Sequence, residues 1–200
     1  MSHQEVNRQL WDSTADRWVE SAEVDWASPD PAWGMWRVPE AEVQALPDLD
    51  GLDAIELGCG TAYFSAWLAR RGARPGGVDQ SKRQLATARA MQRQHGIEFP
   101  LIEADAEDVP LPDASFDLAL SEYGASLWCE PARWIAEAAR LLRPAAGSSS
   151  SPARRCWFSA RRPRPSWRPS ASPGPSSGST ASSGTTPTAR RSSSTSRTAR

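Results

Sequence analysis

The stretch Ala54-Ile-Glu-Leu-Gly-Cys-Gly-Thr-Ala62 decides the fold class of this 200-residue chain. Its first four residues predict a short strand, which runs directly into Gly58-Cys-Gly60. A helix is predicted from Thr61 to about Arg71, because Thr61 can cap its first turn and Gly72 is a typical stop signal. Glycines at such a strand-to-helix turn let backbone N–H groups approach a ligand that a Cβ would block.

Strands and helices alternate on the carboxyl-terminal side of this stretch. Further strands are predicted at 74–78, 98–103 and 116–121, and helices are predicted from Ser81 to His95 and after Pro131. Such alternation is typical of βαβ units. We therefore expect an α/β fold, with a Rossmann-like, doubly wound, mostly parallel sheet that helices cover on both faces.

The residues before this region predict an N-terminal helical lid over 1–52, followed by a ligand-binding domain over 53–146. Apolar residues at helical spacing predict an amphipathic helix over about 4–22, and a short helix is expected at 39–46. The tryptophans of this region either pack inside the lid or line an aromatic pocket, and the sequence leaves both open: Trp11, Trp18, Trp26, Trp33 and Trp36.

An acidic residue, Asp79, follows the second predicted strand, 19 residues after Gly60. An acid at this place can accept hydrogen bonds from both hydroxyls of a ribose. The start of the helix after the glycine loop favours a negatively charged ligand group. The sequence therefore predicts an adenosine-type ligand. The dinucleotide fingerprint G-x-G-x-x-G would need a glycine where Tyr63 stands, which argues against a bound pyrophosphate.

These segments resemble the class I S-adenosylmethionine-dependent methyltransferases. Their first motif, an acid followed by G-x-G-x-A, is matched by Glu56 and the glycine loop up to Ala62. Gly77-Val-Asp-Gln-Ser81 resembles the acidic segment after their second strand, and Glu103-Ala-Asp-Ala-Glu-Asp-Val-Pro110 resembles their adenine-binding segment. The resemblance implies a methyltransferase of the small-molecule type with S-adenosylmethionine as its cofactor.

The resemblance also implies a set of cofactor-binding residues. Asp105 would accept a hydrogen bond from the exocyclic amine of adenine, the Ala106 N–H would reach a ring nitrogen, and the stem of Gln80 would cover the ring. No catalytic residue or general base is assigned, although Glu122 and Tyr123 lie near the expected acceptor position. The implied cofactor-binding residues are Glu56, Gly58, Cys59, Gly60, Asp79, Gln80, Asp105, Ala106 and Ser121.

Each of the three acids also has a purely structural interpretation. Glu56 could be a buried strand carboxylate held by backbone amides, Asp79 could cap the next helix, and Asp105 could fix its loop. Two other functions stay open as well. The chain could bind S-adenosylmethionine without catalysis, or as a form inactivated by truncation, and an NAD-dependent oxidoreductase is the remaining alternative.

Composition excludes several other classes. The three cysteines, Cys59, Cys129 and Cys156, lack metal-ligand spacing and the pattern of a disulfide framework, so we expect no metal. No signal peptide or membrane-spanning run is visible, which predicts a cytoplasmic protein without a membrane partner. Residues 1–146 carry a net charge of −11, so nucleic acid is not expected as a partner.

Residues 147–200 differ sharply from the rest of the chain. They contain 17 Ser and 10 Arg but no acidic residue and no Leu, Ile, Val or Met, so we expect a disordered low-complexity tail. The carboxyl-terminal half of the sheet is then expected to be incomplete. The same nucleotides read with a fixed offset permit an apolar run at 156–159, which would suit a buried fifth strand.

We therefore predict a frameshift in the gene near residues 144–146. Sequencing the gene should show an insertion or deletion there and an open alternative frame that encodes aliphatic residues. Continuous coding sequence without such an alternative frame would contradict the prediction.

Overall fold

The computed structural model describes residues 1–144 and the backbone of residues 155–159. The elements of this part of the chain, in order, are α1 (His3–Thr14), the 3₁₀ helix η1 (Ala15–Trp18), α2 (Val19–Ala27), β1 (Ala32–Trp33), β2 (Val38–Pro39), α3 (Glu40–Val43), β3 (Asp53–Leu57), α4 (Tyr63–Arg70), β4 (Arg74–Asp79), α5 (Lys82–His95), β5 (Leu101–Glu103), β6 (Leu118–Glu122), α6 (Ala125–Trp128), α7 (Pro131–Leu141) and β7 (Arg155–Ser159).

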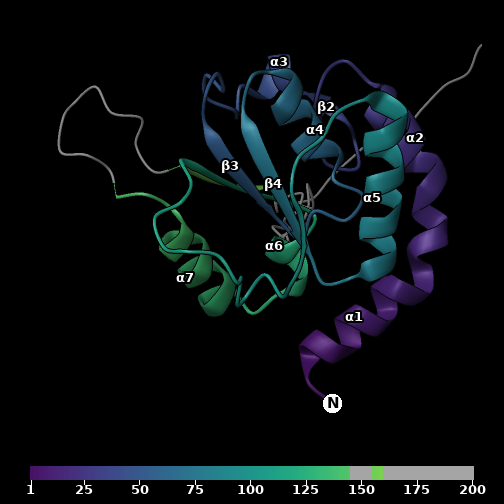
Figure 1. Cartoon of the computed structure of the whole chain (residues 1–200), viewed down its shortest axis with the longest axis vertical. Coiled ribbons are helices and arrows are strands. Elements are labelled where there is room, and N and C mark those ends of the chain that lie inside the picture. The colour runs from purple at the N-terminus through teal and green to yellow at the C-terminus, as the bar shows by residue number, and fades with distance from the viewer. Residues whose placement is uncertain (145–154, 160–200) are drawn as a thin grey trace, which may run out of the picture. The chain divides into compact units, whose positions relative to one another are not determined.

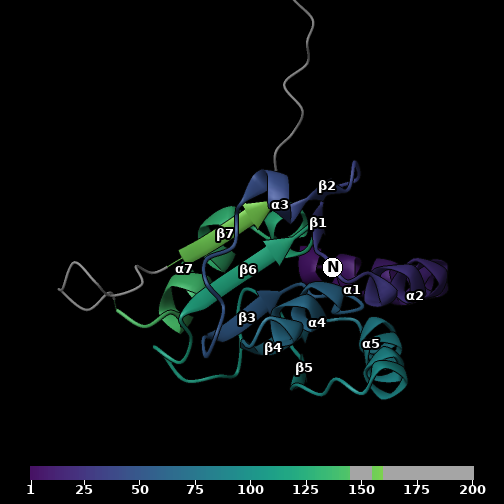
Figure 2. The ribbon, with the colours of Figure 1, turned by 90° about the horizontal axis from the view of Figure 1, so that it is seen from above.

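Five parallel strands form the central sheet, in the order β5-β4-β3-β6-β7 (Figure 2). The first strand in sequence, β3, lies in the middle, where Ile55 pairs with Gly76 on one side and with Ala119 on the other. Because the strands are parallel, the carboxyl ends of β3, β4 and β6 meet at one edge, and the strand order reverses at β3, which is where such sheets open a crevice. The predicted doubly wound, Rossmann-like α/β fold is confirmed.

Helices cover both faces of this sheet, as Figure 1 shows for α7 on one side and for α4 and α5 on the other. Side chains of β3 alternate between the two layers. Ile55 and Leu57 pack in the cluster that contains Trp134 of α7, whereas Ala54 packs in the cluster that contains Trp67 of α4. The sheet thus separates the apolar core into two layers, one on each face.

The chain before β3 contains helices α1, η1, α2 and α3 and also the antiparallel pair of β1 and β2. The expected helix over 4–22 is divided into α1, η1 and α2. Trp26 and Trp33 are buried in the core, whereas Trp36 is exposed. Within the described residues, no helix has both the length and the apolar character needed to cross a membrane.

The expectation of a structureless tail over 147–200 is wrong at Arg155–Ser159. These five residues form β7, which pairs in parallel with β6 from Leu118↔Arg155 to Glu122↔Ser159. Among the described residues, the sheet therefore has one strand, β7, beyond β6. The expectation relied on the lack of aliphatic residues, but Cys156-Trp-Phe158 includes aromatic residues, which also favour strands. The rest of the predicted tail lies outside the described residues.

Two glycine backbones touch where β3 and β6 end. Gly58 has φ +72°, and a Cβ there would lie 2.5 Å from the Ala125 nitrogen and 2.8 Å from the Gly124 Cα. A Cβ on Gly124 would lie 2.1 Å from the Gly58 carbonyl oxygen. Because backbone atoms cannot move aside as a flexible side chain can, only glycine fits both places.

We expect Gly58→Ala to lower the free energy of unfolding by about 2–4 kcal/mol, because left-handed strain and a backbone clash add together. The matched control is Gly96→Ala, which also has φ +64° but whose Cβ would meet nothing within 4 Å. This control should cost only about 1 kcal/mol. Urea denaturation of the full chain measures both, and equal losses would contradict the packing argument.

Candidate active site

A cavity of about 330 Å³ lies at the carboxyl-terminal edge of the sheet. Its walls come from the segments that follow β3, β4, β5 and β6, together with the N-terminal helices. This is the edge at which open α/β sheets bind ligands. Seven of the nine residues that the sequence predicts for cofactor binding line it: Gly58, Cys59, Gly60, Asp79, Gln80, Asp105 and Ala106.

The glycine loop is tied to the end of the neighbouring strand β4. The N–H groups of Gly58 and Cys59 both donate to the Val78 carbonyl, at 2.8 and 2.9 Å. The Gly60 N–H donates to Oδ2 of Asp79 at 2.8 Å. A Cβ on Gly60 would have no heavy atom within 4 Å, so the loop presents open space to the cavity at this point.

Asp79 contacts the start of α5, in line with the structural interpretation that the sequence left open. Its Oδ1 accepts from the Ser81 N–H at 2.8 Å, at the start of α5, while Oδ2 accepts from Gly60. Burial raises the pKa of the Asp79 carboxyl above its usual value, and the two N–H donors offset this only in part. Since a carboxylate has about four acceptor positions, Asp79 keeps capacity for hydroxyl donors from the cavity.

Glu56 and Ser121 lie beneath the cavity, in the buried interior, and do not belong to its lining. Oε2 of Glu56 accepts from the N–H and the hydroxyl of Ser65, at 2.8 and 2.6 Å. Burial raises the pKa of Glu56 to about 8, although both bonds lower it. The Ser121 hydroxyl donates to the Leu57 carbonyl and accepts from the Ser126 N–H. Glu56 thus holds the start of α4, and Ser121 joins the end of β3 to α6.

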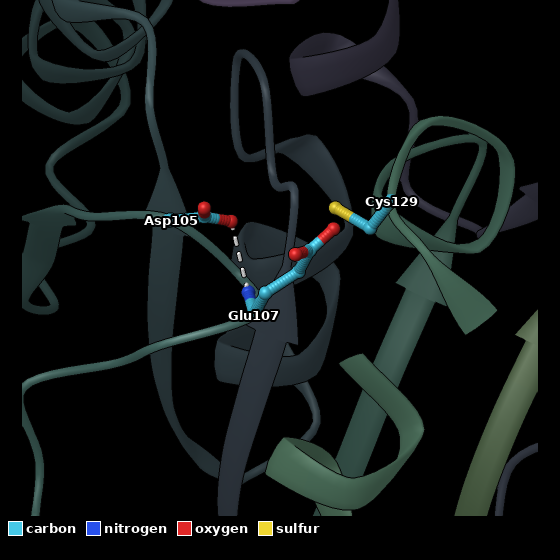
Figure 3. Close-up of side chains that lie close together, drawn as sticks. All are labelled: Asp105, Glu107 and Cys129. Atoms are coloured by element: carbon cyan, nitrogen blue, oxygen red, sulfur yellow. Dashed lines mark hydrogen bonds between the residues drawn. The ribbon is translucent and has the colours of Figure 1, made fainter. Parts of the chain in front are cut away.

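Asp105, Glu107 and Cys129 lie close together beside the cavity (Figure 3), with one potential ligand atom of each within 4.8 Å of the others. The Asp105 carboxylate accepts from the Glu107 N–H at 2.9 Å, which fixes the turn. Burial raises the pKa of Cys129 to about 12, so its sulfur is a neutral thiol at neutral pH.

Glu107 already has protein partners for its carboxylate. Its side chain is fully buried and accepts from the Glu130 N–H at 2.7 Å, from Gln4 at 3.0 Å and from His3 at 2.6 Å. Burial alone would raise the pKa of Glu107, but these bonds hold it below its usual value. The cluster therefore attaches the start of α1 to the loop before α7.

Helix α1 closes one side of the cavity. Trp11 and Trp18 line it, and Trp11 meets Trp128 of α6 edge-on at a ring distance of 5.1 Å. Asp12 accepts from the Ser81 hydroxyl at 2.6 Å, which ties α1 to the start of α5. Of the five tryptophans whose role the sequence left open, these two are pocket residues.

Other lining residues were missed in the sequence. Trp128 lies in α6, a single turn that the apolar pattern does not predict. The sequence indicates Tyr63 only as a residue that argues against a bound pyrophosphate. In the structure, its hydroxyl lies 2.8 Å from Oε2 of Glu122. Glu122 and Tyr123, expected near the acceptor, both line the cavity. The signal for Tyr63 was available, since it is the first residue of the helix after the glycine loop.

Comparison with known proteins agrees with this geometry. Residues 55–146 match the family described as “Methyltransferase domain”. The fatty-acid O-methyltransferase of Mycolicibacterium smegmatis is 33% identical over 102 residues, which cover 50% of this chain and 36% of that protein. The malonyl-[acyl-carrier protein] O-methyltransferase of Serratia marcescens is 38% identical over 96 residues, covering 47% and 35%. The chain thus spans little more than a third of these relatives.

Solved structures resemble the chain over a longer stretch. The [4+2]-cyclase SpnF aligns with a TM-score of 0.59 and 25% identity, over 72% of this chain and 58% of that chain. A S-adenosylmethionine-dependent methyltransferase from Aquifex aeolicus aligns with a TM-score of 0.52 over 66% and 68%, at 14% identity, a level that supports the fold alone.

We expect Asp79→Ala to weaken binding of S-adenosylhomocysteine by about 10- to 100-fold, since a hydrogen bond to a charged group contributes about 1.5–3 kcal/mol. The matched control is Asp108→Ala, an exposed acid outside the cavity lining, which should leave affinity unchanged. Isothermal titration calorimetry measures both variants, and unchanged affinity in Asp79→Ala would count against the site.

Proposed function

We propose that this chain transfers a methyl group to a small-molecule acceptor. The premise is that residues 55–146 are a class I S-adenosylmethionine-dependent methyltransferase domain. The observation that carries the proposal is that seven predicted cofactor residues line one cavity. These residues come from three segments that are far apart in sequence, after β3, β4 and β5.

The residues present fit the cofactor. Gly60 leaves open space that a Cβ would fill, and the Asp79 carboxylate keeps acceptor capacity toward the cavity. In the proposed assignment, Asp79 holds the ribose hydroxyls, Asp105 accepts from the adenine amine, the Ala106 N–H reaches a ring nitrogen and Gln80 covers the ring. Glu56 and Ser121 act from below by holding the loops.

When bound, S-adenosylmethionine supplies an electrophilic methyl group on a sulfonium centre. The protein contributes alignment of the acceptor and exclusion of water. Trp11 and Trp18 of the N-terminal segment cover the cavity, and Trp128 closes it from α6. Their large apolar rings reduce the access of water to this side of the cavity, and charge interactions are stronger where water is excluded.

Fold alone does not establish this reaction, because one scaffold supports several chemistries. The similar structure of SpnF is named a cyclase, whereas the named sequence relatives are methyltransferases. The sequence relatives therefore favour methyl transfer over the non-catalytic alternative. An NAD-dependent reaction is disfavoured by Tyr63, which lines the cavity where a dinucleotide site needs glycine.

Calorimetric titration of the full chain with S-adenosylmethionine, S-adenosylhomocysteine and NAD tests the cofactor class. We expect one site for each of the first two ligands and no measurable heat from NAD, because Tyr63 occupies the space of a pyrophosphate. Binding of NAD, or failure of both sulfur-containing ligands to bind, would contradict the proposed function.

A further inference from the structure

The charged side chains that line the cavity are acidic. Among the described residues that line it, three are acids, namely Asp79, Asp105 and Glu122, and none is Lys, Arg or His. Asp79 and Asp105 are assigned to the cofactor, so an anionic acceptor would face the Glu122 carboxylate with no basic side chain among the described lining residues, which is costly in a partly desolvated site. The charge of the lining therefore favours a neutral or cationic acceptor.

Glu122 is the acid that the cofactor assignment does not use. It is 7% exposed, and it lies at the end of β6, the strand beside β3. Its Oε2 accepts from the Tyr63 hydroxyl at 2.8 Å, and its Oε1 accepts from the Gly34 N–H at 3.0 Å. The carboxylate is thus held from α4 on one side and from the segment after β1 on the other.

The groups around Glu122 shift its pKa in opposite directions, so its carboxylate can be ionised and can also accept a proton. Burial raises its pKa above the usual value, while Tyr63 and the Gly34 N–H lower it. Asp25 of α2 raises it further, and Arg37 lowers it but is paired with Asp25. The buried Glu56 on β3 is the remaining acid that interacts with Glu122.

Aromatic rings line the same cavity. Trp11, Trp18 and Trp128 form a chain of ring contacts at 5.9 and 5.1 Å, and the Trp128 Nε1–H donates to the Tyr123 carbonyl at 3.2 Å. Tyr123 directly follows Glu122 and also lines the cavity. The faces of such rings attract cations. The rings and the carboxylate therefore favour the same kind of ligand.

We propose that the acceptor is a primary or secondary amine, which binds in the cavity as its ammonium ion, and that Glu122 receives the proton that the nitrogen loses. This inference rests on the proposed methyltransferase function. The nitrogen keeps the electron pair of its broken N–H bond and uses it to bond the methyl carbon. The sulfur keeps the electron pair of its broken bond to that carbon.

An amine suits the charge of the site better than an alcohol or a phenol. Loss of a proton turns an ammonium ion into a neutral amine, whereas a hydroxyl would become an anion beside the Glu122 carboxylate. Tyr63 is a positioning residue in this scheme. Its hydroxyl orients the Glu122 carboxylate and lowers the proton affinity of Glu122, since it donates to the charged form.

The test uses three probes that share one skeleton and differ in charge: phenethylamine, 2-phenylethanol and 3-phenylpropanoic acid. Each is titrated into the full chain saturated with S-adenosylhomocysteine, and methyl transfer from S-adenosylmethionine is followed by mass spectrometry. We expect the amine to bind at least about 10-fold more tightly than the alcohol, the acid not to bind, and only the amine to gain a methyl group.

Variants separate the roles of the two side chains. Glu122→Gln should abolish the preference for the amine and its methylation, with S-adenosylhomocysteine affinity retained. The exposed control Glu98→Gln should change neither. Amine binding needs an ionised Glu122, so affinity should rise with pH through the pKa of that residue. Tyr63→Phe should move this rise to higher pH, because a donor to the carboxylate is lost.

The outcomes distinguish this inference from the proposed function. Failure to bind S-adenosylhomocysteine would overturn the proposed function, and this inference with it. If the cofactor product binds, the amine inference alone is overturned by equal binding of the three probes, by absence of binding of all three, or by an unchanged amine preference in Glu122→Gln. An unshifted pH profile in Tyr63→Phe would overturn the positioning role.

Discussion

The backbone contact between Gly58 and Gly124 is the constraint on which the site depends. It brings the loop after β3 against the turn after β6, and neither place tolerates a Cβ. The loop is also tied to β4 through the Val78 carbonyl and Asp79. The ends of three strands are thereby fixed relative to one another. This arrangement places Gly58, Asp79 and Glu122 around the same cavity.

Carboxylates perform different tasks here because their surroundings differ. Glu56 is fully enclosed and holds the start of α4 through Ser65. Glu107 is equally buried, but its several donors keep it charged and attach α1 to the domain. Asp79 and Glu122 also have two donors each, but unlike Glu56 and Glu107 they line the cavity. Position relative to the cavity, rather than residue type, separates these acids.

Local signals in the sequence were reliable where they concerned a single element. Ser81 caps α5 through the Gln84 N–H, as the capping pattern predicts, and the positions of β3, β4 and β6 agree within two residues. Short elements were missed, because α6 is one turn long and carries too few residues for a periodic pattern. Strand β7 was missed because a segment without aliphatic residues was assumed unable to pair, although β6 offers it a complete parallel partner.

The sequence by itself determined the fold class and seven of the residues that line the cavity. Both depend on short motifs, a glycine turn and an acid after each of two strands, whose meaning comes from local backbone geometry. Only the tertiary structure decided which tryptophans face the cavity, and only it brought Tyr63 and Gly34 onto Glu122. These pairs are separated by 59 and 88 residues. Contacts over such distances depend on how helices pack on the sheet, which no local pattern encodes.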